Sequence, residues 1–240
     1  MYLNIDSGVP AKSSLLTYSS TTATSIPNLY IDGVVFSSFH SSSVNGAVLY
    51  SSNSIILTFN NCVFINSTAS RGGSLYIDNS IKGNIIINGC SFINNKALNS
   101  AGAIYLLSNI RNISIVSSTF YRNTAVAGNA GAIFVYNTTK NFVLTNTTFV
   151  SNAASKGAGG CIFMSIGLQK YVTISNSRFI SNTAVSGIIL KLITIFLTYV
   201  ISLGGVIYNQ NANLSHLTIS GCYFQSNTAS GGKYTLSVCL

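Results

Sequence analysis

The chain has almost no acidic side chains. Its 240 residues contain three aspartates, Asp6, Asp32 and Asp78, and no glutamate, against 12 lysines and arginines. A site that cleaves acidic polysaccharides needs clustered carboxylates, either as an acid–base pair or as ligands of a calcium ion. Because three scattered aspartates offer little for this chemistry, we expect no catalytic site and no cofactor.

Charged residues of either sign are scarce. They make up only 6% of the chain, whereas about 25% is usual for soluble domains. The lysines and arginines are spread along the chain, as at Lys82, Arg111 and Lys140, without a basic run, so nucleic acid is not expected as a partner. His40 and His216 stand apart, and no zinc-ligand spacing of cysteines occurs, so no metal site is expected either. The remaining candidate partners are surface proteins or glycans of a host or of neighbouring cells.

Two motifs recur along the chain with one shared period. The phenylalanine of a Phe-x-x-Asn-x-Ala motif recurs every 28 to 30 residues, apart from one interval of 45. A second motif, Gly-[Ala/Ser/Cys/Val]-[Ile/Leu/Val]-aromatic, precedes each later phenylalanine by 18 or 19 residues. A repeat of this length indicates a solenoid. The phenylalanines are Phe36, Phe64, Phe92, Phe120, Phe149, Phe179 and Phe224, and the glycines are Gly46, Gly73, Gly102, Gly131, Gly160 and Gly205.

Residues 84–106 show the pattern of one repeat. Ile85 and Ile87 alternate with outward-facing residues, Phe92 follows a short polar bend, and a glycine opens a third strand, AGAIYL. Three short strands in 28 or 29 residues predict one coil of a parallel β-helix, whereas helical repeats would show i, i+3, i+4 spacing. We therefore predict an all-β chain with about seven coils over residues 28–240, preceded by a polar N-terminal segment or partial cap at residues 1–27.

The repeated side chains are expected to form ladders inside the cylinder. Equivalent residues of neighbouring coils lie about 4.8 Å apart, so phenylalanine rings can stack and asparagine amides can bond each other and the turn backbone. The repeated glycines would supply a positive φ or a close backbone approach at a corner. The predicted ladder residues are Phe64, Phe92, Phe120, Phe149, Phe179 and Phe224, and Asn95, Asn123, Asn152, Asn182 and Asn227.

Within residues 28–232 the two motifs read GGSLY, AGAIY, AGAIF, GGCIF and GGVIY, and FINN, FYRN, FVSN, FISN and FQSN. They resemble the repeats of the polymorphic outer membrane protein family, in which GGA[I/L/V] and FxxN occur many times. The first coil departs from this pattern, with Phe39 in place of asparagine and Leu49 in place of the aromatic residue, and the second has Ser67 in place of asparagine. The resemblance implies a right-handed β-helix of the pectin-lyase-like fold, displayed on a cell surface and often acting as an adhesin.

From these features we expect a non-catalytic, structural or adhesin-like protein that is extracellular or on the cell surface, and a fragment of a longer chain. The alternative is a carbohydrate-binding or polysaccharide-cleaving protein like the pectate lyases, because many parallel β-helices cleave acidic polysaccharides. Five Asn-x-Ser/Thr sequons agree with an extracellular location and are candidate glycosylation sites: Asn66, Asn112, Asn137, Asn146 and Asn213.

Three of the five cysteines occupy one position of the repeat, two residues before the phenylalanine. Other coils have Val34, Ser118, Thr147 and Ser177 there, so a row of small packed side chains is the main interpretation of Cys62, Cys90 and Cys222. A disulfide between Cys62 and Cys90, which lie in adjacent coils, is the alternative. Cys161 follows a motif glycine and is expected in the core.

One hydrophobic segment, GIILKLITIFLTYVIS at residues 187–202, interrupts the repeat and accounts for the interval of 45 residues. Its length approaches the ~20 residues of a membrane span, but a single crossing would place the two sides of one coil on opposite sides of a bilayer. Three interpretations remain: an apolar loop, a flap that contacts a membrane or a partner, or translated non-coding sequence. The resumption of the repeat in register on both sides favours the last.

Overall fold

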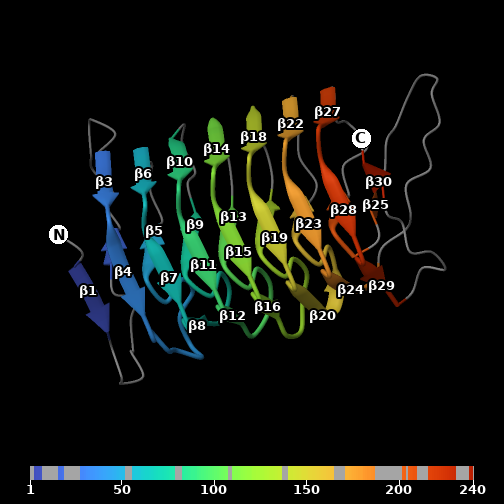
Figure 1. Cartoon of the computed structure of the whole chain (residues 1–240). Helices are drawn as coiled ribbons and strands as arrows, with labels where there is room; N and C mark the ends of the chain where they lie inside the picture. The colour runs from blue at the N-terminus through green and yellow to red at the C-terminus, as the bar shows by residue number, and fades with distance from the viewer. Residues whose placement is uncertain are drawn as a thin grey trace.

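Strands from successive turns of the chain stack into four sheets that together enclose one elongated core (Figure 1). The computed structural model describes residues 3–6, 16–18, 28–51, 56–78, 83–107, 110–136, 140–164, 171–186, 202–203, 205–209, 216–230 and 238–239. Neighbouring strands in a sheet come from neighbouring coils, and nearly all of them pair in parallel, as β10 (Asn84–Asn88) does with β14 (Asn112–Val116). This arrangement is a parallel β-helix, as the sequence predicts.

The strands of the four sheets are given in spatial order. The nine-stranded sheet contains β1 (Leu3–Asp6), β4 (Val34–Ser37), β7 (Val63–Ile65), β11 (Ser91–Ile93), β15 (Thr119–Tyr121), β19 (Thr148–Val150), β23 (Arg178–Ile180), β28 (Tyr223–Gln225) and β30 (Val238–Cys239). The seven-stranded sheet contains β27 (His216–Ser220), β22 (Tyr171–Ser175), β18 (Asn141–Thr145), β14, β10, β6 (Ile56–Asn60) and β3 (Asn28–Asp32).

The other two sheets lie on the remaining sides of the cylinder. The six-stranded sheet contains β29 (Thr228–Ala229), β24 (Thr183–Ser186), β20 (Ala153–Ala158), β16 (Thr124–Ala125), β12 (Lys96–Ala97) and β8 (Thr68–Ala69). The eight-stranded sheet contains β2 (Leu16–Tyr18), β5 (Leu49–Ser51), β9 (Leu75–Asp78), β13 (Ile104–Leu107), β17 (Ile133–Tyr136), β21 (Ile162–Met164), β26 (Ile207–Asn209) and β25 (Ser202–Leu203). Two described pairs are antiparallel, β25 with β26 and β28 with β30.

The structure has four sheets, one more than the three strands per coil expected from the sequence. The additional sheet is made largely of two-residue strands such as β12, which are too short to show an alternating pattern. Five coils, those beginning at β6, β10, β14, β18 and β22, have a strand in every sheet. Within the described residues the first coil has only an isolated bridge from His40 to Thr68 at the fourth sheet, and the last coil has three strands. About five complete turns and two partial ones therefore replace the expected seven.

Each coil turns two of its corners through a residue with positive φ, a conformation in which asparagine is enriched and glycine is free of strain. These residues fall into two rows, listed here from the first coil to the last: Gly33, Asn61, Gly89, Ser117, Asn146, Asn176 and Gly221, then Ser38, Asn66, Asn94, Arg122, Ser151, Ser181 and Ser226. In both rows the next residue points into the cylinder. The corners thus direct polar groups toward the core, where each of them needs a hydrogen-bond partner.

An asparagine ladder supplies these partners at the second corner. The Nδ2 of Asn123 donates to the carbonyl oxygen of Phe92 in the preceding coil at 2.9 Å and to the Oδ1 of Asn152 in the next coil at 3.0 Å. Its Oδ1 accepts the backbone N–H and the Nδ2 of Asn95, at 3.0 and 3.1 Å. The same pattern extends to Asn182 and Asn227, and all five ladder asparagines are buried. Every polar group of these internal amides is therefore paired.

Hydroxyl and thiol groups close the first corner in a similar way. Ser118, Thr147 and Ser177 each donate to the carbonyl oxygen two residues earlier, at 2.8 to 2.9 Å. Cys62, Cys90 and Cys222 occupy the same row and make the equivalent contacts from sulfur, at 3.2 to 3.4 Å. The sequence interpretation of this row as small packed side chains is incomplete, because these side chains also pair with the backbone of the turn.

The phenylalanines stack beside the asparagine ladder. Adjacent rings, from Phe36 to Phe224, have centroids 4.6 to 5.1 Å apart and planes within 14° of parallel. The isoleucines, leucines and other apolar residues of the seven-stranded and eight-stranded sheets complete this single core. Phe39 and Ser67, which replace asparagine in the first two coils, are both buried at the start of the ladder.

The motif glycines have two different roles. In four of the motifs the first residue of the pair has a positive φ, and alanine takes this conformation at Ala101 and Ala130 where glycine does at Gly72 and Gly159. The second residue is glycine because of close approach, since a Cβ at Gly102 would overlap the carbonyl oxygen of Gly131. This close approach repeats from coil to coil along the cylinder.

The first coil is shifted by one residue relative to the sequence alignment. Leu49 pairs with Leu75 and points into the core, and Tyr50 pairs with Tyr76 and stacks on it at 5.5 Å. The aromatic position of the first coil is therefore Tyr50, and the prediction that Leu49 replaces it is wrong. The cause is that Gly46, with a positive φ, corresponds to Gly72 and not to Gly73.

The two segments that lie outside the main repeat are only partly described. The N-terminal segment contributes β1 and β2, which extend two of the sheets. The hydrophobic segment 187–202 lies outside the described residues except for Ser202, where β25 begins. Within the described part of the chain, no helix is long and apolar enough to cross a membrane.

We predict that Asn123→Leu destabilises the protein by about 3 kcal/mol, because the Phe92 carbonyl and the Asn95 amides lose buried partners. Asn88→Leu is the matched control, since Asn88 is exposed on β10, and it should change the free energy of unfolding by less than about 0.5 kcal/mol. Chemical denaturation followed by circular dichroism measures both. Equal effects of the two substitutions would contradict the ladder.

Candidate binding surface

One strip of polar and aromatic side chains runs along the outside of the cylinder, at the first residue of five strands in the seven-stranded sheet: β10, β14, β18, β22 and β27. Asn84, Asn112 and Asn141 come first, with Asn112 Nδ2 donating to Asn84 Oδ1 at 2.9 Å and Asn141 Nδ2 donating to Asn112 Oδ1 at 2.8 Å. Tyr171 and His216 continue the row in the next two coils. We call these five residues the outer strip.

The aromatic end of the outer strip is open to solvent. The Tyr171 ring stacks on the His216 ring with centroids 4.9 Å apart and an angle of 23° between the planes. Half of the Tyr171 side chain is exposed (50%), and His216 is exposed as well. The pair forms a flat π-surface of the kind that packs against another ring or against an apolar face.

Two cations border the outer strip. Arg111 and Lys140 are exposed and immediately precede Asn112 and Asn141. They lie in adjacent coils, because the carbonyl oxygen of Arg111 accepts the N–H of Asn141 and that of Lys140 accepts the N–H of Tyr171, at 3.2 and 3.0 Å. Amides, an aromatic face and positive charge thus lie together on one edge of the molecule. This combination suits a ligand with hydroxyl groups, a ring face and negative charge.

Sequence reasoning missed the outer strip, although its signal is present. Each member stands eight residues before a motif phenylalanine, as Asn84 does before Phe92 and Tyr171 before Phe179. The residue type at this position changes from asparagine to an aromatic residue between the coils of Asn141 and Tyr171, so the position does not stand out as a repeated motif. A comparison of equivalent outward positions would have found it.

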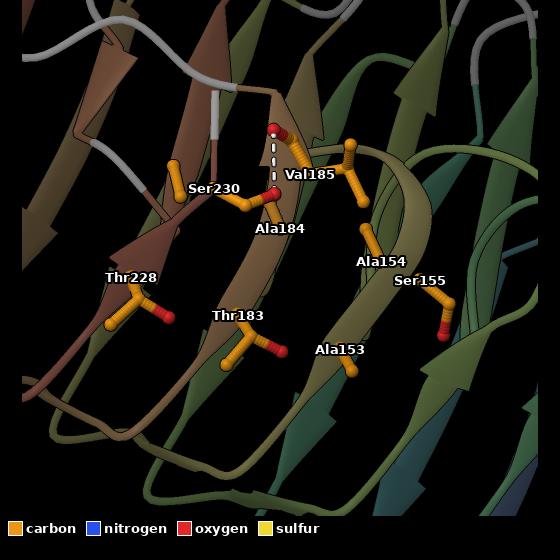
Figure 2. Close-up of a pocket in the computed structure, with 9 residues that line it drawn as sticks. Ala153, Ala154, Ser155, Thr183, Ala184, Val185, Thr228 and Ser230 are labelled. Carbon is orange, nitrogen blue, oxygen red and sulfur yellow. Dashed lines mark hydrogen bonds between the residues drawn. The ribbon is translucent and has the colours of Figure 1, made fainter. Parts of the chain in front are cut away.

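A shallow groove of about 350 Å³ lies over β20, β24 and β29 (Figure 2). Ala153, Thr183 and Thr228 come from equivalent positions of these three strands, and Ser230 Oγ donates to the carbonyl oxygen of Val185 at 3.2 Å. Methyl and hydroxyl groups make up the lining, and no charged side chain contributes. The groove therefore offers little to orient a ligand or to perform chemistry.

The acidic and histidine side chains singled out from the sequence do not come together. Asp32 ends β3 in the seven-stranded sheet and accepts bonds from Asn61 Nδ2 at 3.1 Å and Tyr30 Oη at 3.4 Å, whereas Asp78 ends β9 in the eight-stranded sheet. His40 is in the isolated bridge near the start of the cylinder, and His216 is in the last coil. Among the described residues, no three His, Cys, Asp or Glu side chains are placed to hold a metal ion.

The four cysteines with described side chains are free and buried. The neighbouring Cys90 side chain lowers the pKa of Cys62 to about 7, and the contact with Cys62, followed by burial, raises the pKa of Cys90. Burial raises the pKa of Cys161 well above its ordinary value. The disulfide alternative for Cys62 and Cys90 is absent from this structure, and neither sulfur is accessible to a substrate.

A second aromatic stack lies outside the cylinder, against the eight-stranded sheet. Its rings are 4.6 to 5.5 Å apart and belong to Tyr50, Tyr76, Tyr105, Phe134 and Phe163. Corner residues Ala101, Ala130 and Ala158 pack with these rings and cover them. Burial, followed by the negative charge of Asp78, raises the pKa of Tyr76 to about 12, and burial also raises the pKa of Tyr105.

Comparison with known proteins supports the architecture. A family model described as a right handed beta helix region matches residues 26–192, which is more than half of the chain. No curated protein and no solved structure matches the chain.

The buried tyrosines predict a fall in stability at alkaline pH. Because the pKa of Tyr76 is higher in the folded than in the unfolded protein, its contribution is complete below pH 10 and is lost as the pH rises toward 12. Tyr76→Phe should therefore flatten the decline of the unfolding free energy over this interval, since phenylalanine fits the same row at Phe134. Tyr171→Phe, on an exposed ring, is the control, and an equal effect of both changes would contradict the assignment.

Proposed function

The chain belongs to the right-handed β-helix family, and we propose that it is a non-catalytic β-helix of the cell surface or of a secreted protein, with a structural or adhesin-like role. The observation that carries this proposal is the division between the inside and the outside of each coil. The motif side chains point inward and are paired in the ladders, as Asn123 is. Equivalent outward positions differ between coils, as at Ile86, Ser114, Val143 and Thr173. The inner residues maintain the scaffold, and the outer face can be adapted to a partner.

The placement of the carboxylates supports a non-catalytic role. Glycoside cleavage by paired carboxylates needs the two groups within about 5–9.5 Å of each other across one bond. Asp32 and Asp78 end strands of different sheets, and Asp32 already accepts bonds from Asn61 and Tyr30. Neither aspartate lines the groove over β20, β24 and β29.

The paired motifs also support a relationship to the polymorphic outer membrane proteins within this broader family. In the structure the FxxN asparagine is the ladder residue and the GG pair forms the tight corner, so both motifs have structural roles. These roles explain why the motifs recur from coil to coil, and they are compatible with display of the outer face on a cell. Contact with a membrane through residues 187–202 belongs to the same proposal.

A second candidate function is carbohydrate binding without cleavage, and the outer strip favours it. Asn84 and Asn141 are the two ends of its amide row, so each has bonding capacity left for sugar hydroxyls. The Tyr171 ring offers a face for a pyranose, and Arg111 and Lys140 offer charge for its carboxylate. The formal net charge of +9 would draw an acidic polysaccharide toward the surface.

Incubation with polygalacturonate, with and without Ca²⁺, should yield neither unsaturated nor new reducing ends. The absorbance of unsaturated products and a reducing-end assay measure this directly. Cleavage that persists through purification and is abolished by Asp78→Asn would overturn the proposed non-catalytic role.

Accessibility of the protein on intact cells to added protease tests the proposed location independently.

If the outer strip binds acidic oligosaccharides, Tyr171→Ala should weaken the binding of an oligogalacturonate about fivefold, since stacking on an aromatic ring contributes about 1 kcal/mol. Tyr30→Ala is the matched control, because Tyr30 is 63% exposed on the same sheet but lies in the first coil, away from the strip. Isothermal titration calorimetry gives both affinities. Equal weakening by the two substitutions would exclude the strip as the binding site.

A further inference from the structure

The sequons have different surroundings in the folded protein. Asn66, Asn112 and Asn146 are in the described part of the chain, and Asn137 and Asn213 lie outside it. The amide of Asn112 is in the middle of the outer strip, where it donates to Asn84 and accepts from Asn141 at 2.9 and 2.8 Å. A sugar on its Nδ2 would have to enter this row of close amide contacts, so the folded coil does not accommodate it.

Asn66 and Asn146 are placed differently. Both occupy positive-φ corners, with φ of 56° and 51°, and both are exposed. Neither side chain makes a hydrogen bond to another residue of the described chain. Their neighbours in the same corner rows are small and polar: Ser38 and Asn94 beside Asn66, and Ser117 and Asn176 beside Asn146. A substituent at either corner projects away from the cylinder without displacing packed side chains.

The third residue of each of these two sequons also faces outward. Thr68 and Thr148 follow the inward-pointing residues Ser67 and Thr147 and are partly exposed. The asparagine and the threonine hydroxyl are therefore on the outside of the same corner, with one buried residue between them. The corner geometry of the β-helix places the acceptor amide and the hydroxyl together.

We propose that Asn66 and Asn146 carry N-linked oligosaccharides and that Asn112 does not. This inference rests on the proposed surface or secreted location, because the donor is a lipid-pyrophosphate-linked oligosaccharide of the secretory pathway. In the transfer, the Asn Nδ2 forms a bond to C1 of the sugar and loses one proton, and the bond from C1 to the pyrophosphate oxygen breaks, releasing the lipid pyrophosphate. The sugars would extend from two different corners of the cylinder.

The test expresses the full chain with an added signal peptide in a eukaryotic secretory host and maps occupied asparagines by mass spectrometry after enzymatic deglycosylation. Thr68→Val and Thr148→Val should each remove one glycan while the corner asparagine stays in place. The secreted, folded fraction should have sugar at Asn66 and Asn146 and none at Asn112. Empty Asn66 and Asn146, or an occupied Asn112 in that fraction, would overturn the proposal.

A gain-of-site variant tests the corner geometry itself. Asn94 occupies the same corner row as Asn66 but lacks a sequon, and Lys96→Thr supplies one with the residue already present at the equivalent Thr68 and Thr124. Lys96→Thr should add one glycan at Asn94, and Lys96→Ala, the matched control, should add none. A folded Lys96→Thr protein without sugar at Asn94 would contradict the role of the corner.

The design separates failure of this proposal from failure of the proposed function. The added signal peptide forces entry into the secretory pathway, so missing glycans would count against the corner sites alone. The location is tested with protein that lacks the added signal peptide. If this protein is inaccessible to protease on intact cells, the result counts against the proposed location alone.

Discussion

The fold depends on a row of buried asparagine amides. Each coil turns sharply through a residue with positive φ, and backbone groups of the turn face the apolar core, where each of them needs a hydrogen-bond partner. The side-chain amides of Asn95, Asn123 and Asn152 supply these partners. Each Nδ2 donates to a phenylalanine carbonyl oxygen of the preceding coil and to the asparagine Oδ1 of the next coil. Because each amide serves two neighbours, no coil is complete alone, and stability is shared along the cylinder as in other solenoids.

This internal requirement leaves the outer surface free. The stacked phenylalanines are the middle residues of strands in the nine-stranded sheet, the ladder asparagines lie at the corner that follows, and the alternate residues of those strands point outward. Along the outer strip the same position changes from Asn84 and Asn112 to Tyr171 and His216 without any change in register. A scaffold of this kind can present a different surface on each coil, which is compatible with the proposed surface role.

The sequence predicts the inward rows well, because the buried positions are also the positions at which the same residue type recurs from coil to coil. Phe92, Asn95 and Ala97 could be placed inside from their spacing alone. The fourth sheet could not be predicted, because a two-residue strand such as Lys96–Ala97 has no periodicity. The outer aromatic stack was also missed, since Tyr76 and Tyr105 alternate with core residues, and their burial comes from packing in a separate cluster with other rings and with Ala101, Ala130 and Ala158.

Hydrogen exchange of the asparagine side-chain amides tests the ladder most directly. An amide proton exchanges slowly when its hydrogen bond breaks only on unfolding of the whole structure. The Nδ2 protons of Asn123 and Asn152 should exchange as slowly as the most protected backbone amides, and those of the exposed Asn88 should exchange rapidly. If the Nδ2 protons of Asn123 exchange as rapidly as those of Asn88, the amide ladder does not hold the coils together.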